Sequence, residues 1–129
     1  PEVFRGLRAR GVKVVYGDIS NEQTLHHANI EEAKVVISTI TDDILVGTSN
    51  LRLTSQIKHL CPQAKIVVTA GSPSQALKLY AAGADYVLRP NKLTARHMLE
   101  VLERLVREEV KDWAQEEIDR LHEEPEILA

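Results

Sequence analysis

Four short apolar runs along the chain alternate with segments whose apolar residues recur at helical spacing. The runs cover residues 12–16, 34–40, 65–70 and 84–88, and turn residues or short polar loops follow each of them. An apolar run of this kind is typical of a strand covered on both faces, as in a parallel sheet. Short links join the alternating strands and helices, which predicts right-handed crossovers. We therefore predict an α/β fold in three layers, with a mostly parallel sheet of about four strands and helices on both faces.

Capping residues set the limits of the predicted helices. A first helix over residues 3–10 is closed by Gly11, and a short helix after the first strand is capped by Ser20 or Asn21. A third helix covers residues 44–60 and stops at Cys61-Pro62, because proline cannot continue the helical hydrogen bonds. A fourth covers residues 74–82, after Pro73 at its first position and before Gly83. Its predicted buried side chains are Ala76, Leu77, Leu79 and Tyr80.

A long C-terminal helix is predicted from about Leu93. One stripe of it carries apolar side chains, namely Leu93, Met98, Val101, Leu102, Leu105 and Val106, and the helix could continue to residue 121. We predict one domain over residues 1–109 and a charged helical tail over 110–129. Trp113, Ile118 and Leu121 cannot be buried by a solvated tail helix alone. They indicate either docking onto a partner or simple exposure on a helix with many i, i+4 charge pairs.

Composition excludes several classes of function. The chain has 129 residues, a formal net charge of −3 and 43% hydrophobic residues, which fits one soluble domain and argues against nucleic acid as a partner. The single cysteine, Cys61, excludes an intrachain disulfide and is expected to be structural. The histidines show no metal-ligand spacing, and no catalytic arrangement emerges. Because the first residues resemble the end of a helix without its beginning, we expect a fragment of a longer protein.

Polar residues gather where the first two predicted strands end. Asp18 and Ser20 follow the first strand, and Thr39, Thr41, Asp42 and Asp43 follow the second. Ligands of parallel α/β sheets bind outside the carboxyl ends of the strands. We therefore expect any binding site at this edge.

Five sequence features in order resemble the RCK or TrkA-N family, the cytosolic nucleotide-binding domains of potassium channels, potassium uptake systems and monovalent cation:proton antiporters. They are GD-x-[ST] at residues 17–20, TL-x-x-A at 24–28, AKVVISTITDD before a helix with Asn50, CPQAKIVVTA, and AGADYVLRP. The stretches GDISNEQTLHHANI and GTSNLRL are similar to the glutathione-gated, Kef-like antiporter branch. The resemblance covers residues 7–105 and implies a Rossmann-like domain.

The resemblance also implies a function and a set of site residues. It implies a regulatory, non-enzymatic domain of a potassium or other monovalent cation:proton antiporter, on the cytoplasmic side of the inner (plasma) membrane. NAD(H) or an adenine nucleotide would bind the intact parent. The partners would be its transmembrane antiporter domain and a second copy of the chain, through the C-terminal helix. The cofactor-binding residues that it implies are Asp18, Ile19, Ser20, Thr39, Thr41 and Asn50, with Asp18 beside the adenine or, in this chain, capping the next helix.

Two departures from the family pattern change this expectation. The 129 residues contain no G-x-G-x-x-G, the turn whose glycines let a backbone approach a pyrophosphate at a helix N-terminus. We therefore expect the chain to carry only the far half of the cofactor crevice and to bind nucleotide weakly or not at all. Thr69-Ala70 also stands where the family often has an arginine. Finally, without the two strands that precede it in the family, the strand at 12–16 would have to pair differently, pair with another chain or be disordered.

The principal alternative is a receiver domain like that of response regulators. The sequence IVVTA, a helix and AGADYVLRP resemble the last third of a receiver. However, a receiver needs an acid pair after its first strand and a phosphoacceptor aspartate that ends its third. Here the second strand ends in SerThrIleThr before its acids, and Arg89 replaces the usual lysine. A small enzyme of the same fold is a further, less favoured alternative.

Overall fold

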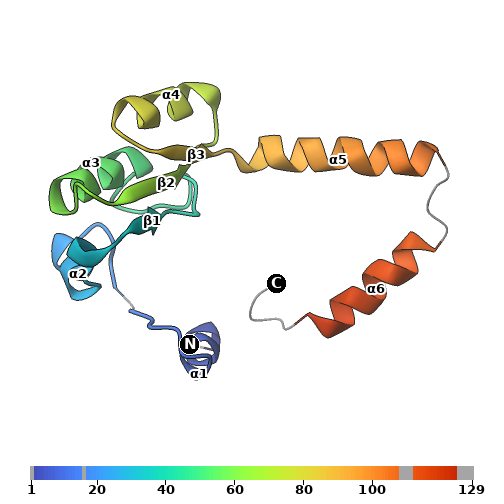
Figure 1. Cartoon of the computed structure of the whole chain (residues 1–129), viewed down its shortest axis with the longest axis horizontal. Coiled ribbons are helices and arrows are strands. Elements are labelled where there is room, and N and C mark those ends of the chain that lie inside the picture. The colour runs from blue at the N-terminus through green and yellow to red at the C-terminus, as the bar shows by residue number, and fades with distance from the viewer. Residues whose placement is uncertain (1, 16, 108–111, 125–129) are drawn as a thin grey trace. The chain divides into compact units, whose positions relative to one another are not determined.

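The computed structural model describes residues 2–15, 17–107 and 112–124 (Figure 1). The chain divides into two compact units. One comprises residues 17–95, and the other comprises residues 1–16 together with 96–129. The predicted binding edge lies in the first of these units.

The unit of residues 17–95 is a parallel α/β layer. Its sheet has the order β1-β2-β3, formed by β1 (Val35–Ile37), β2 (Lys65–Thr69) and β3 (Tyr86–Leu88). Both pairings are parallel, with Ile37 opposite Val67 and Val67 opposite Tyr86. The other elements are α2 (Glu22–His27), η1 (Ile30–Glu32), α3 (Asn50–Leu60) and α4 (Pro73–Ala81). The predicted α/β fold with a parallel sheet is confirmed.

The strand predicted over residues 12–16 is wrong for 12–15, and Tyr16 lies outside the described residues. Residues 12–15 form no helix or strand, and Val12 and Val15 are each nearly half exposed. The sheet therefore has three strands among the described residues. Apolar β-branched residues favour extended backbone, but a strand also needs a neighbour to take its amides and carbonyls. The sequence of one segment cannot supply that neighbour.

The core lies between the sheet and the helices α3 and α4, which pack against each other on the same face (Figure 1). Alternate strand residues point into it: Ile66, Val68 and Val87 are buried. On the opposite face Val35, Ile37 and Tyr86 are more than half exposed. The prediction of helices on both faces is thus wrong for the described residues of this unit. The reason is geometric, because two successive right-handed crossovers that advance in one direction place both helices on one side.

The helix predicted over 44–60 begins later, at Asn50. Ser49 caps it by accepting a hydrogen bond from the Arg52 N–H at 3.1 Å. Gly47 has a φ of +74°, a left-handed conformation that interrupts a helix and favours glycine. The end at Leu60 before Cys61-Pro62 is as predicted.

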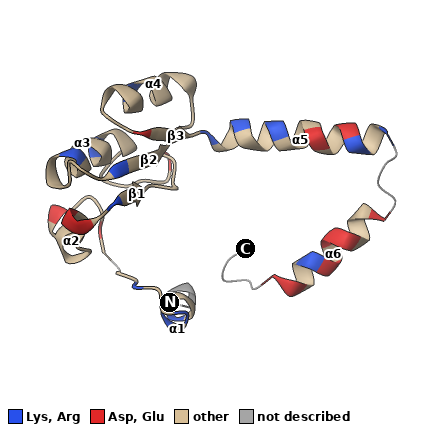
Figure 2. Cartoon of the chain, viewed as in Figure 1, with Lys and Arg blue, Asp and Glu red and all other residues tan. Residues whose placement is uncertain are grey.

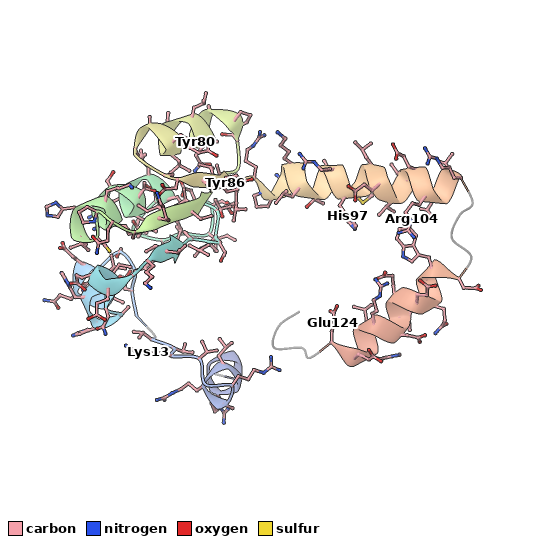
Figure 3. The ribbon with its side chains drawn as sticks, viewed as in Figure 1. Lys13, Tyr80, Tyr86, His97, Arg104 and Glu124 are labelled. Carbon is pink, nitrogen blue, oxygen red and sulfur yellow. The ribbon has the colours of Figure 1, made fainter. Side chains whose placement is uncertain are left out.

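The predictions for α4 are likewise confirmed at some residues and wrong at others. Pro73 lies at the first turn of α4, and Gly83 follows that helix with a φ of +103°. Ala76 and Leu79 are buried as predicted, but Leu77 is 72% exposed and Tyr80 45% exposed. Tyr80, labelled in Figure 3, still has a structural role, because its hydroxyl accepts a hydrogen bond from the Val87 N–H of β3 at 3.1 Å. This bond covers an amide that β3 would otherwise present to a further strand.

The other unit contains the helical ends of the chain. They are α1 (Glu2–Ala9), most of α5 (Pro90–Val106) and α6 (Trp113–Glu123). The long helix predicted from Leu93 therefore begins three residues earlier and is followed by a separate helix. Arg104 of α5, labelled in Figure 3, lies over the Trp113 ring of α6, 4.7 Å from its centroid. Most of the charged residues of α6 are acidic (Figure 2). Of the helices in the described part of the chain, none is long and apolar enough to span a membrane.

Candidate functional site

The carboxyl ends of β1 and β2 are held together by one buried amide, that of Asn50. Its Nδ2 donates hydrogen bonds to the Ile40 carbonyl oxygen at 2.8 Å and to the Thr69 carbonyl oxygen at 3.0 Å. The side chain is fully buried at the start of α3, and the Thr54 hydroxyl donates to the Asn50 carbonyl oxygen at 2.7 Å. Asn50 therefore joins two strand ends inside the fold, where its amide protons are already used.

Asp42 is turned toward the helices rather than toward the outside of the strand ends. Its Oδ1 accepts a hydrogen bond from the Asn50 N–H at 2.7 Å, and its Oδ2 accepts one from Gln75 Nε2. A carboxylate at the first turn of a helix is stabilised by the exposed amides and by the helix dipole. The neighbouring acid, Asp43, is exposed. Two adjacent acids facing a phosphate would be unfavourable, and this arrangement turns one of them away.

The threonines of the same loop remain available to a ligand. Thr39 is exposed and Thr41 is half-buried. Behind them, the Thr69 hydroxyl donates to the Ser38 carbonyl oxygen at 2.8 Å, and so fixes the last residue before Thr39 to β2. The loop backbone is thus held from the inside while two hydroxyl-bearing residues face outward or partly outward.

Asp18 forms a tight turn ahead of α2. Its Oδ1 accepts a hydrogen bond from the Ser20 N–H at 2.8 Å. Hydrogen bonds from the Ser20 side chain and backbone lower the pKa of the exposed Asp18 carboxyl below its usual value. Asn21, one of the two predicted caps, caps α2 by accepting from the Gln23 N–H at 2.9 Å. Asp18 therefore orders the turn before α2, and the cap of that helix is Asn21 rather than Asp18.

Gly17 is required by the approach of α2 to this turn. A Cβ built on Gly17 would lie 2.5 Å from Thr24 Cγ2, far inside van der Waals contact. The Gly-Asp pair and Thr24, which are two of the family-like features, are thus one packing arrangement. It brings Ile19 inward, where it packs against the core.

A small, mostly apolar pocket joins the two loops. It has a volume of about 230 Å³ and includes both Ile19 and Thr39. The remaining lining residues come from α2, η1, β1 with its following loop, and α3: Leu25, Ile30, Val36, Ile37, Ser38, Ile40, Leu53 and Ile57. Ser20 lies near the other end of the second loop, because its Oγ is 3.5 Å from a Cβ built on Gly47.

The structure therefore brings together most of the residues predicted for the site. Ile19 and Thr39 share a pocket, Asp18 and Ser20 form the turn beside Ile19, and Thr41 lies in the same loop as Thr39. Asn50 differs, because it is internal and holds the strand ends. Sequence reasoning missed Gln75, although S-x-x-Q at residues 72–75 is a recognisable helix-start pattern.

The histidines and the cysteine stand apart from this edge. His26 contacts Glu31 through Nδ1, and its Nε2 lies 3.6 Å from Glu22 Oε1, so the pKa of His26 is raised, chiefly by Glu31. The fully buried Cys61 thiol donates to the Glu31 and Ala33 carbonyl oxygens, both at 3.3 Å. Across the described ranges, no three His, Cys, Asp or Glu side chains are grouped to hold a metal ion.

Comparison with known proteins decides the family. The statistical model of the TrkA-N domain matches residues 1–90 of this sequence. The chain belongs to the TrkA-N family. The family resemblance of the sequence is thereby confirmed, and the TrkA-N fold is favoured over the receiver alternative.

Curated relatives extend the match toward the Kef-like branch. The chain is 32% identical over 101 residues to the glutathione-regulated potassium-efflux system protein KefC of Cronobacter sakazakii, over 78% of this chain. It spans 15% of the length of that relative.

Solved TrkA-N and channel structures share the fold. The TrkA-N domain of the inner membrane protein ybaL from Escherichia coli is 28% identical with a TM-score of 0.65, over 76% of this chain and 70% of that one. The GsuK channel bound to NAD is 34% identical with a TM-score of 0.57, over 71% of this chain and 16% of that one. The Rossmann-like assignment of the TrkA-N chain is thus confirmed.

Proposed function

We propose that this TrkA-N chain is part of a non-enzymatic, ligand-sensing domain that regulates a membrane transporter for potassium or another monovalent cation, as in a cation:proton antiporter. The observation that supports it most is the pocket shared by Ile19 and Thr39 at the strand ends. One of the similar solved structures is that of the GsuK channel bound to NAD. In this proposal the intact protein binds NAD(H) or an adenine nucleotide at the same edge.

Each residue of the edge has a role in this proposal. The apolar wall around Ile19 takes one face of the adenine ring. The Asp18 carboxylate and the Ser20 backbone, on either side of Ile19 in the chain, meet the edge of the ring in this proposal, where a carboxylate can accept a hydrogen bond from the exocyclic amine. Thr39 and Thr41 offer hydroxyls to the ribose. Asn50 acts from behind, by holding the loop that carries both threonines.

The chain by itself holds the ribose and adenine side without a phosphate cradle. No glycine-rich turn occurs in its 129 residues, and such a turn normally supplies backbone amides and a helix N-terminus to the pyrophosphate. We therefore propose that residues 1–129 bind nucleotide weakly, and that the remaining contacts come from other parts of the parent protein.

Regulation would follow from a population shift. A nucleotide that binds one arrangement of the domains more tightly than another favours that arrangement by its difference in binding free energy. In the proposed parent, the shift acts on a transmembrane antiporter domain, and the TrkA-N chain lies on the cytoplasmic side of the inner membrane.

A second copy of the chain is the proposed partner of α5. This helix has no buried residue, and Met98, Leu102 and Leu105, which lie on one stripe at positions i, i+4 and i+7, are each about half exposed. Burying such side chains stabilises an interface by about 1.5 to 3 kcal/mol each, against an association cost of about 4 to 15 kcal/mol. Several must therefore be inserted together, as in a symmetric helix pair.

The proposal is tested by mapping the nucleotide on the chain with ¹H–¹⁵N correlation spectra at millimolar NADH. We expect concentration-dependent shifts of the Asp18, Ile19 and Ser20 amides together with those of Thr39 and Thr41. Shifts confined to α5 or α6, or no shift anywhere with NADH, AMP or ATP, would contradict the proposed site.

A further inference from the structure

Gln75 joins the loop after β1 to the loop after β2. Its Nε2 donates a hydrogen bond to Asp42 Oδ2, and its Oε1 accepts one from the Gly71 N–H at 2.9 Å. Both atoms of one amide are therefore used, each by a different strand-end loop. Because a primary amide presents its donor and acceptor in one plane, this pairing fixes the distance between the two loops as well as their orientation.

The position of Gln75 is itself fixed. It lies at the third position after the α4 cap residue Ser72, whose Oγ accepts a hydrogen bond from the Gln75 N–H at 3.2 Å. A Gln at this position usually returns to the backbone of the cap residue, but here it reaches Gly71, one residue earlier. The half-buried side chain thus has its direction set by the first turn of α4.

Asp42 connects Gln75 to residues 39–43, the part of the loop after β1 that carries Thr39 and Thr41. Its carboxylate is shared between Gln75 and the Asn50 N–H, and it lies directly after Thr41. Inside the fold the Asn50 amide makes a second, parallel link from Ile40 to Thr69. Two amides, one buried and one half-buried, therefore attach residues 40–42 to the end of β2.

We propose that Gln75 and Asp42 are positioning residues for the nucleotide edge. Their hydrogen bond sets the conformation of residues 39–43, and so the direction in which Thr39 and Thr41 meet a ribose. This inference rests on the proposed nucleotide function and adds two residues, one of them from α4, that touch no nucleotide in it.

Solvent can reach this link. A cavity of about 290 Å³ between α3 and α4 includes Asp42 and Gln75 in its wall, together with Ser49, Ser74 and Lys78. Substitution of Gln75 or Asp42 therefore removes a link at the edge of the core, and the buried Asn50 amide still holds the strand ends. The folded state should survive the changes that test the inference.

The test uses isosteric exchange in the complete chain. In Gln75→Glu, a carboxylate faces the Asp42 carboxylate, and in Asp42→Asn, an amide faces the Gln75 amide. In the double variant Asp42→Asn with Gln75→Glu, the donor and the acceptor are exchanged and the hydrogen bond can form again, while the Asn50 and Gly71 N–H groups keep their acceptors. Gln115→Glu is the matched control, because Gln115 Nε2 donates to Asp119 Oδ1 at 3.0 Å on the exposed face of α6.

Two readouts are taken on each variant: amide hydrogen exchange of residues 39–43, and the AMP affinity from shifts of the Thr39 and Thr41 amides. We expect each single variant to speed exchange about fivefold or more and to weaken AMP binding about threefold or more, as the loss of one hydrogen bond would. The double variant should restore both, and Gln115→Glu should change neither.

Three different results would contradict the inference. If the single variants speed exchange but leave the AMP affinity unchanged, Gln75 and Asp42 are structural only and the inference is wrong. If they change neither readout, or if the double variant restores neither, the hydrogen bond does not position the loop. If AMP and NADH shift no amide of the unsubstituted chain, the proposed function itself fails, and with it the nucleotide role of both residues.

Discussion

The side-chain amide of Asn50 donates a hydrogen bond to the carbonyl oxygen of Thr69 at 3.0 Å, and both residues are buried. Asn50, at the start of α3, thereby forms a hydrogen bond with the last residue of β2. Its second amide proton forms one with the Ile40 carbonyl oxygen in the loop after β1. The carboxyl ends of the parallel strands lie at one edge of the sheet, and the Asn50 amide holds the segments at these two ends together.

Substitution of Asn50 should destabilise the fold. Asn50→Ala leaves the Ile40 and Thr69 carbonyl oxygens without this donor, so we expect a loss of about 2 to 4 kcal/mol in the free energy of unfolding. Urea unfolding followed by circular dichroism measures it. Asn91→Ala, at an exposed position of α5, is the control and should stay within about 0.5 kcal/mol. Equal unfolding midpoints for the two variants would show that the Asn50 bonds contribute nothing.

The α/β architecture and its connections could be predicted because each helix and strand carries its own signal. Pro73, Gly83 and Cys61-Pro62 mark helix limits by local backbone chemistry, and the structure follows them. Local signals could not show whether residues 12–16 form a strand, because a strand depends on partners distant in the sequence. Its apolar residues satisfy the local pattern and still form no strand over residues 12–15.

The candidate site could likewise be predicted only in part. Ligands of parallel sheets bind outside the carboxyl ends of the strands, and this rule pointed to the Asp18 turn and to the loop with Thr39 and Thr41. Ile19 of the first segment and Thr39 of the second share a pocket. The rule could not show that Asn50 faces inward or that Asp42 is bound by Gln75, 33 residues away. Such a contact depends on how α3 and α4 pack, and no spacing within one segment encodes it.

Asp85 should make stability depend on acidic pH. The Ile66 N–H donates to its Oδ2 at 2.8 Å and Lys65 Nζ to its Oδ1 at 3.2 Å, and these bonds lower the pKa of the Asp85 carboxyl. A lowered folded-state pKa contributes stability above the unfolded value of 3.8, and this contribution is lost as the pH falls through the folded value. The difference in urea midpoint between the wild type and Asp85→Asn should therefore shrink below pH 3.8. A difference that is constant from neutral to acidic pH would contradict this.

The α5 stripe should behave as an interface rather than as core. Because Leu102 and Leu105 are about half exposed, Leu102→Asp with Leu105→Asp should give a folded monomer from a dimeric wild type, by light scattering and circular dichroism. The control Arg96→Asp with Arg107→Asp adds the same carboxylates away from the stripe and should remain dimeric. An unfolded double variant would indicate that the stripe is intrachain core, and a monomeric wild type at high micromolar concentration would refute the dimer.

Phosphorylation separates the TrkA-N assignment from a receiver. Asp42 is occupied by the Asn50 N–H and Gln75, so we expect no Mg²⁺-dependent mass increase after incubation with acetyl phosphate. Intact-protein mass spectrometry provides the measurement. A stable phosphate adduct that is lost in Asp42→Asn or Asp43→Asn would contradict the transporter proposal.

Our proposal is that this TrkA-N chain carries the adenine and ribose side of the crevice without the phosphate cradle. It is tested most directly by comparing the dissociation constants of adenosine and NADH on the same sample, from the shifts of the Ile19 and Thr39 amides. Since residues 1–129 contain no glycine-rich turn for the pyrophosphate, we predict that both ligands bind weakly and within about threefold of each other. NADH binding at least about tenfold tighter than adenosine, or in the low micromolar range, would show a phosphate site within these residues and contradict the proposal.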